Sequence, residues 1–429
     1  MAPFVLMLVV LVLQMAVGVP LSLSILSSAI LYLLLAGQPL YLVAQLLFHG
    51  VDMFTIMAIP FFLLAGELML ASGTSERLLE FSNLLVGRLR GGTGYVNVFA
   101  SMLFGGCSGS ASADIAGIGR MEVDMMTRSG FTRERSVALT VSTSIMGNII
   151  PPSIPLVLVG AVTNTSIGGL LIGGVIPGVL VGLSMAVAVY LQTRGMERAR
   201  QSGASLGEVA RTVVRAIPFL MMPVIILGGM LSGAFTPTEA SAAAAAWGFL
   251  LLLAAAGNFR RKPRVVFGIL VRSAVLSASV LLMIGAANVF SWILANEGIP
   301  AAIASLLFTL TSNPLIILLL VNIFLLLWGF FMDMAPAIFI VMPILVPLAA
   351  KFGIDPVHFG VICIFNLVIG LITPPYGTAL SVGSIVFRMP MERMVRHMFP
   401  YYVAALVVLA LITYVPEIVL FLPRLFHLA

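Results

Sequence analysis

Long apolar runs, separated by short polar segments, fill almost the whole chain. The clearest runs lie near residues 2–17, 20–36, 51–72, 168–194, 213–232, 238–257, 264–290 and 398–425. A helix of about 20 apolar residues is long enough to cross a bilayer. The pattern therefore predicts an all-α polytopic membrane protein, and the charged fraction of only 9% agrees with this.

Two further segments are apolar on one face only. In residues 75–90 the leucines and Val86 fall on one side of a helix, and the charged residues fall on the other. Residues 298–311 resemble a second segment of this kind. Such amphipathic helices are typical of arms that lie along the membrane interface.

Two apolar stretches are interrupted at their centres by small or polar residues. Residues 93–127 have a Gly/Ser-rich tip at 105–112, and residues 313–350 have a polar tip at Asp333–Pro336. Each half of the first stretch holds only about 15 residues, too few to cross the hydrocarbon core comfortably. The pattern predicts two re-entrant hairpins.

Double prolines break two other apolar stretches. Pro151-Pro152 interrupts residues 131–165, and Pro374-Pro375 interrupts residues 355–388. Proline removes a backbone donor and clashes with the preceding turn. Backbone freed at membrane depth is tolerated only where protein or a water-filled cavity receives it, so both breaks are expected to line a site.

The second half of the chain repeats the first. At an offset of 223 residues, matching positions follow one another in order: Pro151-Pro152 on Pro374-Pro375, Gly160 on Gly383, Gly130 on Gly353, Pro177 on Pro400 and Ser110 on Asp333. At an offset of 225, Val96-Asn97 falls on Val321-Asn322 and Gly73 on Gly298. Chance alignment of apolar segments would explain one such match, whereas an ordered series indicates an internal duplication.

The two halves are expected to have opposite orientations. Four full spans lie between the broken stretches, so the second broken stretch runs opposite to the first. Inverted repeats with broken helices are the architecture of secondary transporters, whose substrate site lies near the bilayer midplane. If the N-terminus lies outside, twenty of the 22 Lys and Arg residues lie inside, and only Lys351 and Arg424 lie outside. The positive-inside rule therefore predicts that both termini are periplasmic.

This repeat divides the chain into five parts, taken in order. We expect scaffold helices and the first arm in 1–92, the first half of a transport domain in 93–194, scaffold helices and the second arm in 195–312, the second half of the transport domain in 313–397, and a C-terminal helix in 398–429.

The hairpin tips and breaks supply the candidate site residues. Ends of helices leave unpaired carbonyls, which suit a small hard cation such as Na⁺, and unpaired amides, which suit an anion. The predicted cation ligands are Ser108, Gly109, Ser110, Ala111, Ser112, Gly147, Asn148, Ile149, Pro152, Asp333, Met334, Ala335, Gly370, Thr373, Pro375 and Gly377. The predicted substrate contacts are Ser110, Ser112, Ser153, Thr373 and Thr378. A lone serine more often joins neighbouring helices, but the clustering at both breaks favours a site.

Two acidic residues, Asp333 and Asp114, allow two interpretations each, and a third, Glu239, allows one. Asp333 lies at a membrane-depth tip, where a carboxylate is costly and usually functional, although it could also cap the helix that follows. Asp114 follows the first tip and has the same two readings. Glu239 follows Thr236, a spacing that signals a helix start.

Enzymatic chemistry is not expected. His49, His358, His397 and His427 fall at the ends of spans, away from the serine tips, and the chain has no HExxH or Walker A motif. A hydrolase that used Ser108 or Ser110 would need a histidine partner.

Several motifs together resemble one transporter family. Gly-Ser-Ala-Ser-Ala-Asp at 109–114, Ile-Ile-Pro-Pro-Ser at 149–153, Phe-Thr-Pro-Thr-Glu-Ala at 235–240, Gly-Ile-Asp-Pro-Val-His-Phe-Gly at 353–360 and Thr-Pro-Pro-Tyr-Gly-Thr at 373–378 are similar to the large membrane subunit of tripartite ATP-independent periplasmic (TRAP) transporters, the DctM-like family. The resemblance covers essentially the whole chain. Tyr376 stands where a small aliphatic residue is expected.

The resemblance implies a function and partners. It implies a Na⁺-coupled symporter in the bacterial inner membrane that carries an organic acid, such as a C4-dicarboxylate, a keto acid or sialic acid. It also implies a periplasmic substrate-binding protein, a small four-helix membrane subunit as a separate polypeptide, and an elevator-type transport domain. The alternative is a stand-alone Na⁺/dicarboxylate symporter or anion exchanger of related fold.

Overall fold

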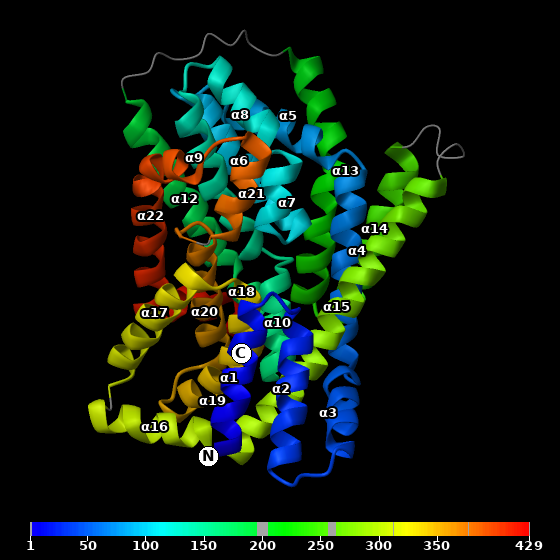
Figure 1. The fold of residues 1–429 in the computed structure, drawn as a ribbon. Helices are drawn as coiled ribbons and strands as arrows, with labels where there is room; N and C mark the ends of the chain where they lie inside the picture. Colours follow the sequence, from blue (N-terminus) through cyan, green and yellow to red (C-terminus); the bar gives the residue numbers. More distant parts are fainter. Residues whose placement is uncertain (1, 195–204, 256–262, 312, 376, 429) are drawn as a thin grey trace.

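The computed structural model describes residues 2–194, 205–255, 263–311, 313–375 and 377–428. These residues form helices and connecting turns, and no strand occurs among them (Figure 1). Seven segments are long and apolar enough to cross a membrane: Phe54–Ala71, Ile167–Thr193, Gly207–Leu231, Pro237–Ala254, Arg264–Asn296, Met334–Lys351 and Met391–Tyr414. The prediction of an all-α polytopic membrane protein is confirmed.

The first two apolar runs form helices that match the predicted bounds, 2–17 and 20–36, to within one residue. Helices α1 (Ala2–Ala16) and α2 (Leu21–Leu35) have 15 residues each. At 1.5 Å per residue each measures about 22 Å, less than the roughly 30 Å of the hydrocarbon core. The chain turns between them at Gly18, whose φ of 88° favours glycine. The two helices pack on each other, and α2 packs on α15.

The first half of the duplicated region contains an arm, a hairpin and a broken helix. Its helices are α3 (Tyr41–Val51), η1 (Phe54–Met57), α4 (Ala58–Ala71), α5 (Thr74–Val86), α6 (Gly92–Ser108), α7 (Ala111–Gly117), α8 (Gly119–Arg128), α9 (Arg133–Thr143), η2 (Ser144–Asn148), α10 (Ile154–Thr163), α11 (Ile167–Gly173) and α12 (Val175–Thr193). Helix α5 is the predicted arm, α6–α8 form the hairpin, and α9–α10 form the broken helix.

The second half repeats this order after two connecting helices. These are α13 (Leu206–Leu231) and α14 (Pro237–Ala255). The repeat then contains α15 (Pro263–Asn296), α16 (Ile299–Leu310), α17 (Pro314–Phe331), α18 (Met334–Pro336), η4 (Ala337–Val341), α19 (Met342–Lys351), α20 (Pro356–Leu371), α21 (Thr378–Phe387), α22 (Met391–Tyr414) and α23 (Glu417–Leu425). The segment η4 is a short π-helix directly after the second tip.

Backbone conformation supports the duplication independently of the sequence match. Positive φ angles occur at equivalent turns in the two halves, at Gly73 and Gly298, at Gly130 and Gly353, and at Asn164 and Arg388. Non-glycine residues rarely adopt positive φ, so the last pair is a specific match. Both of these residues end the second segment of a broken helix.

Figure 1 shows the two halves upside down relative to each other. The arm α5 and the base of the first hairpin lie at the upper end of the molecule, and the arm α16 and the base of the second hairpin lie at the lower end. The tips at α7 and α18 both reach the middle. The expectation of an inverted repeat with two re-entrant hairpins and two broken helices is confirmed.

Packing between the halves brings the tips and breaks together. Helix α7 of the first hairpin packs on α21, which follows the second break. In the same way α10, which follows the first break, packs on α19 and η4 of the second hairpin. Around this centre, α4 packs on α14, and α15 packs on α2, α3 and α4.

Candidate functional site

The first tip and the first break approach each other closely at two glycines. A Cβ atom added to Gly105 would lie 2.8 Å from the Cα of Gly147. A Cβ added to Gly109 would lie 2.4 Å from the carbonyl oxygen of Pro152. Only glycine permits so close an approach. The end of α6 is therefore seated directly in the gap between α9 and α10.

Side chains of the first break close it with hydrogen bonds. Asn148 accepts a bond from the backbone N–H of Ala111 at 2.5 Å, which joins the break to the tip. The Ser153 hydroxyl donates to the carbonyl of Asn148 and accepts from the N–H of Leu156, so it caps α10. Asn148 and Ser153 thus hold the backbone of the site in place.

The serines of the first tip differ in what their hydroxyls do. Ser110 caps α7 by accepting a bond from the N–H of Ala113 at 3.4 Å. Ser112 is exposed. Ser108 is buried, and its hydroxyl has no hydrogen-bond partner among the described residues. Because a buried hydroxyl without a partner is costly, Ser108 is the side chain of this tip best placed to bind a ligand.

The second tip repeats the glycine contact of the first. A Cβ added to Gly370 would lie 2.7 Å from the Cα of Gly329, so α17 and α20 meet backbone to backbone. Gly329 and Gly370 are the counterparts of Gly105 and Gly147 at offsets of 224 and 223 residues. The duplication thus preserved the close approach of each tip to its break.

The second tip carries a carboxylate where the first carries a serine. Asp333 precedes α18, but its side chain makes no capping bond to that helix. It accepts a bond of 3.2 Å from the Thr378 hydroxyl at the start of α21. The carboxylate therefore faces the second break, and this contact favours the functional reading of Asp333 over the capping one.

The other predicted residues of the second tip and of the two breaks differ in their burial and hydrogen bonds. Met334 and Ala335 are half-buried in α18, and Pro375 is exposed. Gly377 is buried, and a Cβ added to it would lie 2.8 Å from the carbonyl oxygen of Leu371 and 2.9 Å from that of Thr373. The Thr373 hydroxyl donates to the carbonyl of Ile369 at 2.7 Å, and Ile149 of the first break is buried. The departure noted at Tyr376 lies outside the described residues.

A buried polar cluster lies behind the first tip. Asp114 and Glu122 are 1% and 0% exposed, and Asn97 donates to Glu122 Oε2 at 2.6 Å. Thr143 donates to Asn97 Oδ1 at 3.0 Å. Both oxygens of Asp114 and Oε1 of Glu122 have no hydrogen-bond partner among the described residues. A buried carboxyl oxygen without a partner is costly, and an acidic residue buried in a membrane protein is a candidate functional residue.

The second half contains the neutral counterpart of this cluster. Asn366 donates to Asn322 Oδ1 at 2.8 Å, and Asn322 donates to Thr413 at 2.9 Å. Asn322 and Asn366 are the counterparts of Asn97 and Thr143. Sequence reasoning singled out Asp114 but missed Glu122. The available signal was an acidic residue within the predicted hairpin 93–127, where a carboxylate at membrane depth is costly.

Comparison with known proteins shows to which family the chain belongs. Residues 4–418 match the family described as "Tripartite ATP-independent periplasmic transporter, DctM component". The chain belongs to the DctM family of TRAP transporters. The resemblance found in the sequence motifs is confirmed, and the chain is the large permease subunit of such a transporter.

Two relatives of this permease are named after a substrate. The sialic acid TRAP transporter large permease protein SiaM of Vibrio cholerae is 39% identical over 410 residues, which are 95% of this chain and 96% of that protein. The C4-dicarboxylate TRAP transporter large permease protein DctM of Pseudomonas aeruginosa is 39% identical over 401 residues, which are 93% of each chain.

A solved structure shares the fold of the permease. The YdaH transporter of Alcanivorax borkumensis, described as having an unusual topology, superposes with a TM-score of 0.59. The match covers 86% of each chain at 16% identity. This likeness supports the transporter fold and nothing about substrate.

Two groups of residues in the permease have structural roles. Glu239 accepts a bond from the N–H of Thr236, and its own N–H donates to the Thr236 hydroxyl, so the pair starts α14 as a capping box. The buried ring of His358 bonds to the carbonyl of Ile412 at 2.7 Å. Among the described residues no hydrogen bond joins a histidine to Ser108 or Ser110.

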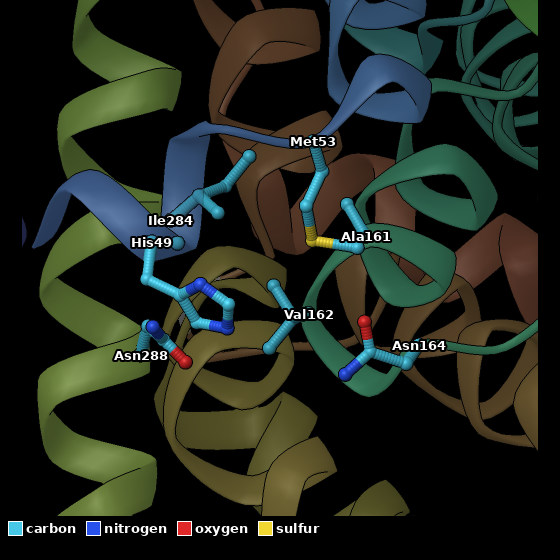
Figure 2. A pocket seen from close by; sticks show the side chains of 8 residues that line it. His49, Met53, Ala161, Val162, Asn164, Ile284 and Asn288 are labelled. Atoms are coloured by element: carbon cyan, nitrogen blue, oxygen red, sulfur yellow. The ribbon is translucent and has the colours of Figure 1, made fainter. Parts of the chain in front are cut away.

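A small pocket lies between the end of α10 and helices α3 and α15. It has a volume of about 160 Å³, and Figure 2 shows the His49 ring and the Asn164 amide on opposite sides of it. Met53 and Asn164 also line a neighbouring pocket of about 320 Å³. Sites for organic ligands usually measure about 300–1,000 Å³. Neither pocket is lined by a residue of the two tips.

Proposed function

We propose that this permease couples the entry of Na⁺ to the uptake of an organic acid. The observation that carries the proposal is the pair of equivalent tip-and-break contacts, one at Gly105 and Gly147 and one at Gly329 and Gly370. Each contact places free helix ends and small polar side chains at the centre of the molecule. Carbonyl ends of helices suit Na⁺, and amide ends suit a carboxylate.

The two tips favour two cation sites of different character. The first would use the Ser108 hydroxyl with carbonyls of the tip and of the break at Gly147–Pro152. The second would use Asp333, whose carboxylate already faces Thr378 at 3.2 Å. The substrate would lie between them, near Ser110, Ser112, Thr373 and Thr378.

The substrate we propose is a small carboxylate. The relatives in Vibrio cholerae and Pseudomonas aeruginosa are named for sialic acid and C4-dicarboxylates, and both substrates carry carboxylate groups. Neutral hydroxyls and backbone amides at the tips would bind such a group without a fixed positive charge.

Orientation and partners follow from the family and the charge distribution. We place the arginine-rich end, with α5, α8 and the start of α9, in the cytoplasm and both termini in the periplasm of a bacterial inner membrane. A periplasmic binding protein would deliver the substrate, and a small four-helix membrane subunit would complete the tripartite transporter.

Movement would follow the elevator pattern. The hairpins, the broken helices, α11–α12 and α22 would move as one transport domain. Helices α1–α5, α13–α16 and their connections would form the scaffold. The glycine contacts join parts of the transport domain to each other, which is what such a rigid unit requires.

Uptake by proteoliposomes tests the proposal. The permease is reconstituted with its small subunit and binding protein, and a panel of labelled organic acids is offered with and without an inward Na⁺ gradient. We expect uptake that needs both the gradient and the binding protein. Uptake without the binding protein would instead indicate a stand-alone symporter or exchanger.

A further inference from the structure

An apolar groove lies between α12 and α22, and no residue of the two tips lines it. Its volume is about 510 Å³, and its lining contains one hydroxyl side chain, Ser184, among apolar ones. The lining side chains are open to the outside: Val187 is 57% exposed, Leu191 55% and Phe399 71%. Both helices are candidate membrane spans, so the groove faces lipid.

The two helices pack antiparallel in a defined register. The Tyr401 hydroxyl donates to Gln192 Oε1 at 3.3 Å, which places the end of α12 beside the start of α22. The groove is lined from Ser184 to Leu191 on α12 and from Phe399 to Val407 on α22. Leu191 therefore lies near Phe399, and Ser184 lies near Val407.

An arginine continues the lining face of each helix at the same end of the groove. Arg194 follows Leu191 by three residues and Val187 by seven, so it shares their face of α12. Arg396 precedes Phe399 by three residues and Val403 by seven, so it shares their face of α22. The antiparallel register places Arg194 and Arg396 at the same end of the groove, one on each helix.

Neither arginine is neutralised within the described part of the chain. Arg194 lies over the Tyr190 ring, 5.0 Å from its centroid, an arrangement that leaves its charge available. Arg396 forms no ion pair with a described residue, although Glu392 lies one turn before it. A phosphate group that bridges Arg194 and Arg396 would supply the missing negative charge.

The dimensions fit one lipid leaflet. From Arg194 back to Ser184 is ten residues, which is about 15 Å along a helix. The hydrocarbon core of a bilayer is roughly 30 Å thick, so one leaflet measures about half of that. We propose that this groove is a binding site for one anionic phospholipid, with its phosphate on Arg194 and Arg396 and an acyl chain between α12 and α22.

Photo-crosslinking tests the site directly. The full-length permease is placed in nanodiscs with phosphatidylglycerol or phosphatidylcholine that carries a photoreactive acyl chain, and labelled peptides are mapped by mass spectrometry. We expect phosphatidylglycerol to label the faces that contain Leu191, Val403 and Val407 more strongly than phosphatidylcholine does. Equal labelling by the two lipids, or labelling only elsewhere, would overturn the proposal.

Variants separate the headgroup contact from the groove. In R194Q/R396Q we expect labelling by phosphatidylglycerol to fall at least about tenfold, because a surface arginine contributes about 1 kcal/mol to binding of anionic lipid. The control R120Q/R128Q removes two exposed arginines of the α8 region and should label as wild type does. Unchanged labelling in R194Q/R396Q would overturn the headgroup assignment.

A groove-filling variant tests the acyl chain. Ala404→Phe should block labelling in the groove by either lipid, and Val407→Phe serves as a second variant if the first fails to fold. Thermal unfolding confirms that each variant is folded before labelling is compared. If the groove labels fully in a folded Ala404→Phe or Val407→Phe protein, the acyl chain does not lie between α12 and α22. Labelling that disappears once the small subunit is added would assign the groove to that subunit instead.

Discussion

Gly370 lies against Gly329 so closely that a Cβ added to it would stand 2.7 Å from the Gly329 Cα. The same relationship joins Gly105 to Gly147 in the other half of the chain, at 2.8 Å. Since the two halves are inverted, the contacts reach the centre of the molecule from opposite ends. They hold each hairpin tip in its break, and the proposed cation sites depend on both.

Enlarging these glycines should separate tip from break. We expect Gly370→Ala and Gly147→Ala each to lower stability by about 1–3 kcal/mol, the usual cost of overpacking a tight interior. Uptake in proteoliposomes should fall more than tenfold. Gly228→Ala is the matched control, because Gly228 lies in α13 with no atom within 4 Å of an added Cβ. Wild-type uptake in Gly370→Ala would show that the close contact is not needed.

Removing the hydroxyl of Ser108 should affect ligand binding and leave stability unchanged. This hydroxyl has no hydrogen-bond partner among the described residues, so Ser108→Ala deletes no contact within the protein. We expect the Na⁺ concentration for half-maximal uptake to rise at least fivefold, with the melting temperature unchanged or slightly raised.

Ser153→Ala is the contrasting variant for Ser108→Ala. Its hydroxyl bonds to the break and caps α10, so its loss should cost about 1 kcal/mol of stability. Ser110→Ala should also lose a cap, and we expect it to weaken Na⁺-driven uptake in addition. If Ser108→Ala and Ser153→Ala behaved alike in both measurements, Ser108 would have no special role.

Neutralising Asp333 should weaken Na⁺ dependence strongly. Asp333→Asn keeps the shape of the side chain and can keep a bond to Thr378, but it removes the charge that would balance a cation. We expect the Na⁺ concentration for half-maximal uptake to rise at least tenfold, with assembly intact. Thr378→Val should have a smaller effect.

The control is Asp124→Asn, which neutralises an exposed carboxylate on α8. If Asp333→Asn had the same Na⁺ dependence as this control, the assignment of Asp333 to a cation site would be wrong.

Removing a side chain from the buried polar cluster behind the first tip should lower stability more than removing an exposed helix cap. Asn97 donates to Glu122 Oε2 and to the Thr140 hydroxyl, so Asn97→Ala takes the donor away from two buried polar groups. The expected loss is about 2–5 kcal/mol, since each unsatisfied buried group costs about 1–3 kcal/mol. Thermal unfolding in detergent measures it. Glu239→Ala, which removes an exposed cap, should cost only about 1 kcal/mol and leave uptake unchanged.

Much of the fold could be predicted from the sequence because its signals are local. Double prolines cannot continue a helix, and glycine and serine interrupt an apolar run, so the breaks and tips were recognisable. The offset between Pro151-Pro152 and Pro374-Pro375 then revealed the duplication. The apolar runs at 2–17 and 20–36 likewise predicted the bounds of α1 and α2 to within one residue.

The chemistry of the site was only partly predictable, because it depends on contacts between distant segments. The sequence placed Ser108, Ser153 and Thr373 together at tips and breaks. It could not indicate that Ser153 and Thr373 bond to backbone carbonyls, whereas the Ser108 hydroxyl bonds to no residue in the described part of the chain. The burial of Glu122 was not predicted, because the neighbouring charged residues of α8 are typical of an exposed helix.

The most direct test of the two cation sites needs no substrate. The melting temperature of the purified permease is followed while NaCl replaces choline chloride at constant ionic strength. A ligand that binds only the folded state stabilises it, so we predict a Na⁺-specific rise in wild type. The rise should shrink in Ser108→Ala and in Asp333→Asn and vanish in the double variant. An equal rise with KCl, or a full Na⁺ response in the double variant, would contradict the proposal that the two tips bind Na⁺.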